Sequence, residues 1–506
     1  MTTLAVEFTT SRMLQTVYGT SNLVWANVIG LVLLFLTAGY FFGGWLADRR
    51  PSPRLFYGIV SLAGFAAVLF LLLTSVILKS AASALAAVNA GALISSLIAV
   101  VVTLAIPITL LGCISPFAIR LGVRNVGEAG RISGRIYAIS TWGSLLGTYL
   151  PVLLVIPLAG SRWAAVIFGG LLLVCGLIGL WQSGRRLDVG ALLLPALLVP
   201  AVMLGLQGTV KSFPGQIYET ESAYNYIQVI RREDCNYLLL NEGQAYHSYY
   251  CDGGRVPRIS VWSIMLAAPY FNAELDKPPV NSMAVVGLAA GTIPKQFTRV
   301  YGPLEVDGIE LDPEIVAAGR EYFALDEPNI HVILGDGRYQ LNRLSGEYDI
   351  VTIDAYKVPY IPWHLTTKEF FDEVSARLTN DGVVAINVGR VPGDRRLVGA
   401  MTATLETVFP SVHAIDVPGS LNTILVATVQ PTSAENLSRN LARLPEGSDP
   451  LLAQVLETAR TNLVAATESN VVFTDERAPV ETIVDSLVLR YLLEEGAAGL
   501  PGLGGQ

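Results

Sequence analysis

The sequence is poor in charged residues, in cysteine and in histidine. Only 15% of its 506 residues are charged, and 34 Lys and Arg against 42 Asp and Glu give a net charge of -8. A nucleic-acid partner requires a basic surface, so this balance argues against one. The chain has 4 cysteines, too few for a disulfide scaffold. No cluster of His, Cys and carboxylate residues has ligand spacing, so no metal site is expected.

The four cysteines fall into two groups. Cys113 and Cys175 lie inside apolar runs, where cysteine serves as a small core residue. Cys235 and Cys251 lie in the more polar second half, and a turn at 241–243 would bring their two segments near each other. A disulfide between them would need an oxidising compartment. We expect two unrelated free thiols instead.

The stretch from Leu23 to Leu206 is dominated by Leu, Val, Ala, Gly and Ile, and charged residues return at ordinary density only after Lys211. A bilayer core about 30 Å thick requires runs of roughly 20 apolar residues. Six such runs occur, at about 23–47, 55–79, 94–119, 136–158, 163–181 and 188–206. Because these runs contain almost no ionisable residue, we expect residues 1–210 to form a multi-pass anchor in the cell membrane, with the lipid bilayer as its partner, rather than a transporter.

Nine of the arginines of this half follow the first, third and fifth runs. The positive-inside rule places these three loops in the cytoplasm. Six spans would then leave the second half of the chain outside the cell. Alternatively, Pro195 and Pro200 interrupt the last run, which would be re-entrant or interfacial and would return the second half to the cytoplasm. We expect the cytoplasmic location.

The second half alternates short apolar strands with helical stretches from Ser282 onward, which indicates a parallel, doubly wound α/β sheet of the Rossmann-like type. Residues 211–281 are expected to form a small antiparallel β domain, residues 282–495 the nucleotide-binding catalytic domain, and residues 496–506 a flexible tail. The expected parallel strands are 283–287, 305–310, 331–334, 349–354 and 383–388, with helices at 313–322 and 367–378.

The ends of these strands carry the candidate site, because ligands of such sheets bind beyond the carboxyl ends of the strands. Gly287 and Gly291 bound a small-residue turn after the first strand, where a ligand can approach backbone N–H groups at a helix start. Glu310 ends the second strand and can accept the hydroxyls of a ribose. Further acidic residues end the third and fourth strands. Four such positions on successive strands predict an adenosine site.

At this point the sequence resembles the spermidine synthase (polyamine aminopropyltransferase) family, in its membrane-fused bacterial branch. The matching stretches are 221–229, 239–244, 286–292, 308–313, 335–337 and 348–354, with a further echo at 474–475 and 478–481. The resemblance implies a small-molecule nucleotide substrate, decarboxylated S-adenosylmethionine, and no prosthetic group. It also implies transfer of the aminopropyl group to a polyamine, with release of methylthioadenosine, by a chain that is commonly a homodimer.

Carried over by position, the resemblance assigns the ribose to Glu310 and the adenine to Asp336, which is followed by Gly337. It places Gln228 and Gln244 near the nucleotide and makes Asp354 the acid/base carboxylate. Three positions depart from the family pattern. Ala290 replaces an aspartate that grips the aminopropyl amine, Lys357 replaces a second catalytic aspartate, and Val261-Trp262-Ser263 replaces a stretch that seats the polyamine.

A polyamine in this pocket would meet repulsion from Lys357 worth on the order of 1 kcal/mol or more per close pair. A ligand with a carboxylate would be attracted instead, and S-adenosylmethionine has one. We therefore expect cleavage of its bond from sulfonium sulfur to the aminobutyryl chain, either as a lyase giving homoserine lactone or as a transferase to another acceptor. Asp354 and Lys357 would bind the amino and carboxylate groups, and Tyr246, His247 and Tyr356 would line the pocket.

Three rival functions remain open. The first is aminopropyl transfer to a polyamine from decarboxylated S-adenosylmethionine. The second is a methyltransferase, because the same sheet serves that chemistry, although the preceding β domain and the placement of Asp354 argue against it. The third is a non-catalytic nucleotide sensor that regulates a membrane partner.

Overall fold

The computed structural model describes residues 1–18, 22–86, 92–184, 189–205, 213–241, 245–273, 280–356, 360–465 and 467–495. The chain divides into two compact units. The first comprises Met1–Ser212 with Glu221–Ala223, and the second comprises Phe213–Thr220 with Tyr224–Gln506. The predicted residues Gln244 and Lys357 and the expected tail 496–506 lie outside the described residues.

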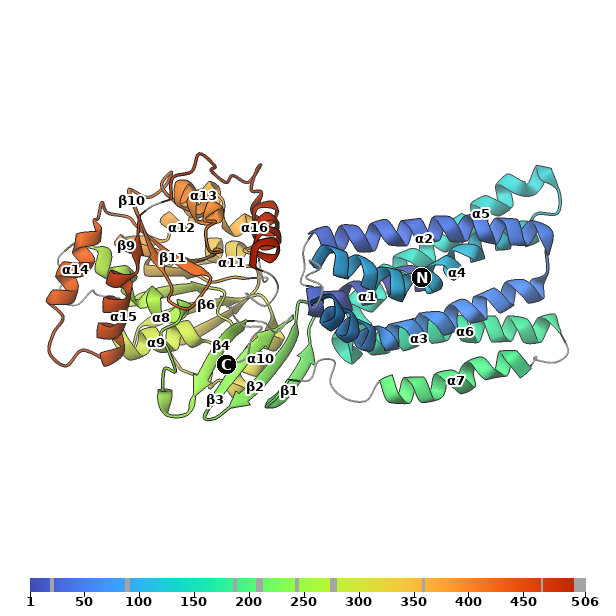
Figure 1. Cartoon of the computed structure of the whole chain (residues 1–506), viewed down its shortest axis with the longest axis horizontal. Coiled ribbons are helices and arrows are strands. Elements are labelled where there is room, and N and C mark those ends of the chain that lie inside the picture. Colours follow the sequence, from blue (N-terminus) through green and yellow to red (C-terminus); the bar gives the residue numbers. More distant parts are fainter. Residues whose placement is uncertain are drawn as a thin grey trace. The chain divides into compact units, whose positions relative to one another are not determined.

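The first unit is a bundle of helices (Figure 1). Its helices are α1 (Thr2–Tyr18), α2 (Asn22–Arg49), α3 (Pro53–Ala86), α4 (Ala92–Gly122), α5 (Ala129–Leu150), α6 (Ile156–Ser183) and α7 (Val189–Gly205). Five segments in the described part are long and apolar enough to cross a membrane: Trp25–Arg49, Pro53–Thr74, Leu97–Gly122, Val126–Val155 and Leu158–Ser183. The apolar helices expected from the sequence are therefore present, and the fourth begins ten residues before its predicted start at 136.

The sixth predicted run forms one continuous helix, α7, with Pro195 and Pro200 inside it. The interruption expected at these prolines is therefore not seen. The bundle packs through small residues, as close helix contacts in lipid require. A Cβ on Gly112 of α4 would lie 2.8 Å from the carbonyl oxygen of Leu36 on α2, so the two backbones touch there.

The second unit begins with an antiparallel sheet in the order β1-β2-β3-β4. Its strands are β1 (Gln216–Glu221), β2 (Tyr226–Arg232), β3 (Cys235–Leu240) and β4 (Tyr246–Cys251). Cys235 and Cys251 are direct partners across β3 and β4, with Cα atoms 4.0 Å apart, and they form a disulfide. The expectation of two free thiols is therefore wrong. The position of the turn fixed the hairpin but not its register, and the register places the two sulfur atoms face to face.

The larger sheet has eight strands in the order β12-β10-β11-β9-β8-β5-β6-β7. These strands are β5 (Ser282–Val286), β6 (Glu305–Glu310), β7 (Ile330–Leu334), β8 (Tyr348–Ile353), β9 (Leu378–Gly389), β10 (Ser411–Asp416), β11 (Asn422–Thr428) and β12 (Leu463–Val464). Strands β5 to β9 pair in parallel, and β11 joins β9 in the antiparallel sense. This confirms the doubly wound α/β fold. The structure also has an antiparallel edge of β10, β11 and β12, which the sequence analysis did not predict.

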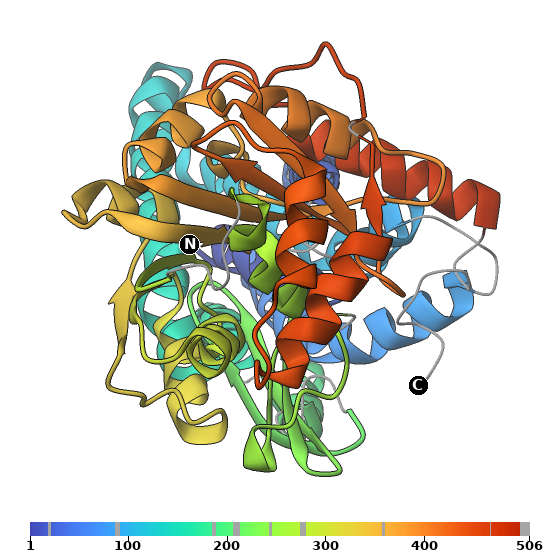
Figure 2. The same cartoon turned by 90° about the vertical axis from the view of Figure 1, so that its left-hand side faces the viewer.

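Helices cover both faces of this sheet and bury its apolar strands in two clusters. One face holds α8 (Val261–Ile264), α9 (Thr292–Tyr301), α14 (Ala434–Ala442) and α15 (Pro450–Thr461). The other holds α11 (Gly337–Arg343), α12 (Lys368–Ser375), α13 (Arg396–Leu405) and α16 (Val480–Glu495). In Figure 2 the orange-red helices α14 and α15 lie against the green segment Val261–Phe271, which carries Trp262. Helix α10 (Pro313–Tyr322) instead shares an apolar cluster with β2 and β3.

Candidate active site

The candidate site lies at the carboxyl ends of β5, β6, β7 and β8, where the order of the sheet reverses. Strand β5 pairs with β6 on one side and with β8 on the other. The connections from β5 and from β8 therefore lead away in opposite directions, which opens the crevice that nucleotides occupy in such sheets. Glu310 is the last residue of β6, Asp336 follows β7 and Asp354 follows β8.

The turn after β5 brings the backbone close to β8. Gly287 has φ 93°, and a Cβ at this position would lie 2.7 Å from the carbonyl carbon of Asp354. Only glycine satisfies both the left-handed backbone and this contact. Gly291 has φ 88° and caps the start of α9. The two predicted glycines thus shape the turn in the way that close approach to a ligand requires.

Glu310 holds this turn in place. Its carboxylate accepts hydrogen bonds from the backbone N–H of Ala289 at 2.8 Å and of Asp312 at 3.0 Å. Burial raises the pKa of Glu310 to about 7, although both amides oppose the shift. Glu310, the residue predicted to bind the ribose, therefore also holds in place the loop that would lie beneath a nucleotide.

Asp336 caps the helix that follows β7. Its Oδ1 accepts from the backbone N–H of Tyr339 at 3.0 Å, and its Oδ2 lies 2.9 Å from Nε2 of His364. Gly337 is the first residue of α11, directly after the cap. An N-cap is the ordinary structural use of an aspartate at this place. Through His364, the cap residue also contacts the segment that follows β8. The sequence analysis did not predict this contact.

Among the three strand-end carboxylates, Asp354 is the one that accepts hydrogen bonds from side chains rather than from backbone N–H groups in the described structure. Its Oδ2 accepts from Nε1 of Trp262 at 2.7 Å, and its Oδ1 accepts from Nδ2 of Asn387 at 2.9 Å. Both donors are neutral. Burial raises the pKa of Asp354 to about 6, and the two hydrogen bonds oppose the shift. At neutral pH the carboxylate is therefore mostly ionised.

A short network orients the groups around Asp354. Asn387 on β9 accepts from Nδ2 of Asn422 at 2.7 Å, and its backbone carbonyl accepts from the hydroxyl of Tyr356 at 3.0 Å. Burial raises the pKa of Tyr356 well above its ordinary value, so the phenol stays protonated. The indole of Trp262 also packs beside the ring of Tyr249, with centroids 5.5 Å apart.

Trp262 and Asn387 are the neighbours of Asp354 that sequence reasoning missed. The sequence marked Trp262 only as a departure from a family pattern, and Asn387 lies inside an apolar strand. Their contacts join residues 92 and 33 positions from Asp354. No periodicity reports a contact across such distances, although a lone polar residue inside the run 383–388 was a usable signal.

The remaining predicted residues lie in or beside the small sheet. Gln228 is buried on β2 and donates to Oε1 of Gln216 at 2.9 Å. Tyr246 packs on Tyr237 with ring centroids 4.5 Å apart. Burial lowers the pKa of His247 to about 4, so its ring is neutral, and its Nε2 is buried without a hydrogen-bond partner in the described structure.

Ala290 occupies an apolar environment. It is 1% exposed and belongs to a cluster with Ile315 and Phe323, while its backbone N–H donates to Oγ of Ser248 at 3.0 Å. A carboxylate here would be buried among hydrocarbon side chains, which is costly without a paired cation. The departure from the family pattern at this position is therefore matched by the packing around it.

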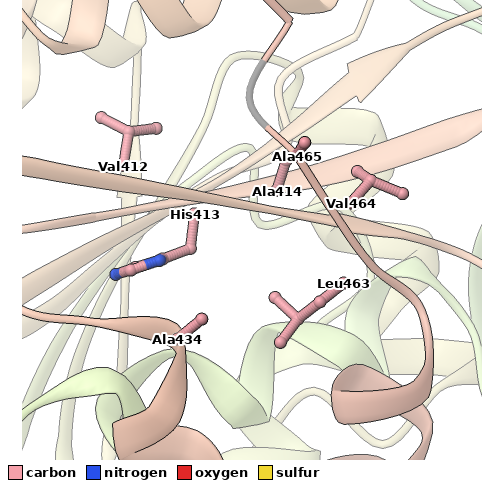
Figure 3. Close-up of a pocket in the computed structure, with 7 residues that line it drawn as sticks. All are labelled: Val412, His413, Ala414, Ala434, Leu463, Val464 and Ala465. Atoms are coloured by element: carbon pink, nitrogen blue, oxygen red, sulfur yellow. The ribbon is translucent and has the colours of Figure 1, made fainter.

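A separate hollow lies at the edge formed by β10, β12 and the start of α14 (Figure 3). Its lining is apolar except for His413, and burial lowers the pKa of that imidazole to about 4. His413 stacks on Phe271 and bonds the hydroxyl of Thr432 at 2.8 Å. These contacts give the histidine a packing role. Within the described residues no group of His, Cys, Asp and Glu could hold a metal ion.

The sheet order and the strand-end carboxylates define a doubly wound domain of the methyltransferase type. Residues 275–438 match the spermine/spermidine synthase domain. The probable polyamine aminopropyl transferase of Bifidobacterium longum is 29% identical over 314 residues, which cover 56% of this chain and 68% of that protein. The mouse eEF1A lysine and N-terminal methyltransferase is 26% identical over 212 residues, 37% of this chain and 30% of that protein.

Among solved structures, a probable spermidine synthase from Corynebacterium glutamicum is 20% identical, with a TM-score of 0.39, and the match covers 52% of this chain and 98% of that one. The resemblance found in the sequence motifs is confirmed, because residues 275–438 match the spermine/spermidine synthase domain and a probable polyamine aminopropyl transferase is among the similar proteins.

Proposed function

We propose that this protein is a membrane-anchored enzyme that binds S-adenosylmethionine and breaks the bond from its sulfonium sulfur to the aminobutyryl chain, releasing methylthioadenosine. Glu310 would bind the ribose and Asp336 the adenine. The apolar helices are compatible with membrane anchoring. A homodimer stays a prediction.

The observation that carries this proposal is the state of Asp354. The carboxylate is mostly ionised at neutral pH, is partly buried, and is bonded by two neutral side chains, Trp262 and Asn387. Within the described residues only neutral donors bond this carboxylate, so no cation there compensates its negative charge. A buried negative charge attracts a cationic ligand strongly, and S-adenosylmethionine carries a sulfonium and an ammonium.

In the lyase reaction the substrate supplies its own nucleophile. A carboxylate oxygen forms a bond to the carbon next to the sulfonium, and the bond from that carbon to sulfur breaks. The electron pair stays on sulfur, which leaves neutral methylthioadenosine and homoserine lactone, and no proton is transferred. Because the sulfonium is already a good leaving group, holding the chain in the attacking conformation supplies most of the rate. Asp354 would hold the ammonium group during this step.

A second candidate is aminopropyl transfer to an amine from decarboxylated S-adenosylmethionine, which the name of the Bifidobacterium longum relative favours. Here the nitrogen of the acceptor attacks the same carbon, and Asp354 takes the proton that the nitrogen loses. The apolar burial of Ala290 and the indole of Trp262 beside Asp354 favour the first candidate, because both occupy positions where the family pattern places groups that bind cationic amines.

The deciding experiment incubates the detergent-purified full chain with S-adenosylmethionine alone and identifies products by mass spectrometry. Methylthioadenosine and homoserine lactone are expected, with a loss of roughly 10–10²-fold in Asp354→Asn, because a hydrogen bond between charged groups contributes about 1.5–3 kcal/mol. Asp372→Asn, which changes an exposed carboxylate on α12, is the matched control. Turnover only with the decarboxylated substrate and an amine would establish the second candidate. S-adenosylhomocysteine as product would mean a methyltransferase, and binding without turnover would mean a sensor.

A further inference from the structure

The disulfide and the distribution of arginines together bear on the side of the membrane that holds the second half of the chain. We propose that α7 crosses the membrane as a sixth span and that the spermine/spermidine synthase domain lies on the oxidising, non-cytoplasmic side. This reverses the cytoplasmic location expected from the sequence, and it does not depend on which reaction the domain catalyses.

The first step concerns α7. Its 17 residues form one helix, with a length of about 25 Å at 1.5 Å per residue, which lies at the short end of the range for spans. No charged residue occurs between Val189 and Val210. Leu194, Leu198 and Val202 fall on one face and share an apolar cluster with α3 and α6. Figure 1 shows α7 alongside these two helices, so it packs lengthwise against helices that are themselves long enough to span.

The second step concerns charge. Nine arginines lie at the ends of the first, third and fifth spans or at the starts of the spans that follow: Arg49, Arg50, Arg54, Arg120, Arg124, Arg131, Arg135, Arg185 and Arg186. In the sequence, the segments expected on the opposite side of the membrane contain Arg12, Lys79, Arg162 and Lys211. Because basic loops stay in the cytoplasm, the side with nine arginines is cytoplasmic. A chain that then crosses once more through α7 emerges on the other side.

The third step is the disulfide, which is independent of the charge count. Cys235 and Cys251 are 1% and 2% exposed, and they pack in the core that also contains Tyr249 and Trp262. The two other cysteines, Cys113 and Cys175, lie in spans and are unpaired. Disulfides persist in oxidising compartments and are rare where thioredoxin and glutathione keep thiols reduced. The bonded pair therefore favours the side that the arginine count assigns to the domain.

One consequence concerns the substrate. An adenosine-containing substrate must reach this domain from the non-cytoplasmic face, and the products must be released there. A process that exports the nucleotide, or that releases it from cells, must therefore supply the reaction.

The proposal is tested by labelling single cysteines in intact cells with a membrane-impermeant maleimide. The background carries Cys113→Ser and Cys175→Ser and keeps the disulfide. Asp372→Cys reports on an exposed position of α12, and Val126→Cys reports on a residue that is 93% exposed and begins the fourth span, on the side that the arginine count assigns to the cytoplasm. The host is a bacterium whose outer membrane has been made permeable to the reagent.

Asp372→Cys is expected to label as fully in intact cells as after lysis, and Val126→Cys only after lysis. A domain reporter that stays unlabelled until lysis overturns the proposal, and so does labelling of both reporters in intact cells. A second measurement uses the unsubstituted chain, in which free thiols are blocked during lysis and peptides are analysed without reduction. A linked peptide containing Cys235 and Cys251 is expected, and two blocked thiols would overturn the proposal. Neither readout requires activity.

Discussion

Replacing Trp262 with phenylalanine tests whether Asp354 is the titrating group that governs activity. Phenylalanine keeps an apolar ring beside Tyr249 but removes the N–H donor that lies 2.7 Å from Oδ2 of Asp354. A hydrogen bond to a charged group contributes about 1.5–3 kcal/mol. At 1.36 kcal/mol per pKa unit, losing it raises the pKa of Asp354 by about 1–2 units, from about 6 to about 7–8.

The ionised fraction of Asp354 at pH 7 then falls from about nine-tenths to between about a half and about a tenth. Release of methylthioadenosine at pH 7 is expected to fall by roughly 2–10-fold, and most of the loss is expected to disappear by pH 9. The assay is kcat/KM for methylthioadenosine release between pH 5 and pH 9, which reports the pKa values of the free enzyme.

A purely structural role for Trp262 would give a different profile. Lost packing would lower activity equally at every pH and would leave the acidic limb of the profile in place, and that result would refute the reasoning. Tyr249→Phe is the matched control. It keeps the ring that packs beside Trp262 and removes a hydroxyl that bonds Gln296 at 2.9 Å rather than Asp354. Its acidic limb is expected to match that of the unsubstituted chain.

Three further predictions concern stability and binding. The folded-state pKa of Asp354 is raised from its ordinary value of 3.8 to about 6, so the stability it contributes is present below pH 4 and is lost as pH rises through 6. At pH 8 the Asp354→Asn variant should therefore be more stable than the unsubstituted chain by up to about 3 kcal/mol in the free energy of unfolding, and its thermal midpoint should be higher. Both differences should vanish near pH 4. Gly287→Ala should lower the thermal midpoint at every pH, because the new Cβ would meet the Asp354 backbone, and an unchanged midpoint would contradict the described turn. Glu310→Gln should weaken nucleotide binding about tenfold in calorimetry, since an amide oxygen can accept from only one of Ala289 and Asp312 with good geometry and about 1–3 kcal/mol is lost.

Much of the fold follows from local patterns in the sequence. The alternation of apolar strands with amphipathic helices placed β6 and α10 at their observed bounds, Glu305–Glu310 and Pro313–Tyr322. Strand order is also accessible, because short crossover connections between parallel strands leave few arrangements. The antiparallel edge of β10, β11 and β12 was not predicted, since no local feature of those segments records which strand each one joins.

The candidate site was predictable at the level of which strand ends meet, and not at the level of what each side chain contacts. Glu310 and Asp354 were predicted to lie at one edge of the sheet because carboxyl ends of parallel strands converge, and the structure places them at the ends of β6 and β8. The partners of Asp354 come from the helix that precedes the sheet and from the interior of β9. Those contacts depend on tertiary packing. The disulfide was missed for the same reason, because a slip of one residue in the β3–β4 register would turn one sulfur to the opposite face.

The acidic strand-end residues differ in what the fold itself requires of them. Glu310 bonds two backbone amides, and Asp336 caps α11, so a domain that bound nothing would still use both. Removing the Asp336 cap is expected to destabilise the domain by about 1 kcal/mol. At Glu310 the two backbone hydrogen bonds stabilise the fold, while burial raises its pKa to about 7 and costs stability, so the two effects oppose each other. Asp354 makes no such contribution, because its burial costs stability at neutral pH. A residue that destabilises the fold and is nevertheless oriented by two side chains is best explained by ligand chemistry. The sign of the stability change therefore separates Asp354 from the helix cap Asp336 without any substrate being known.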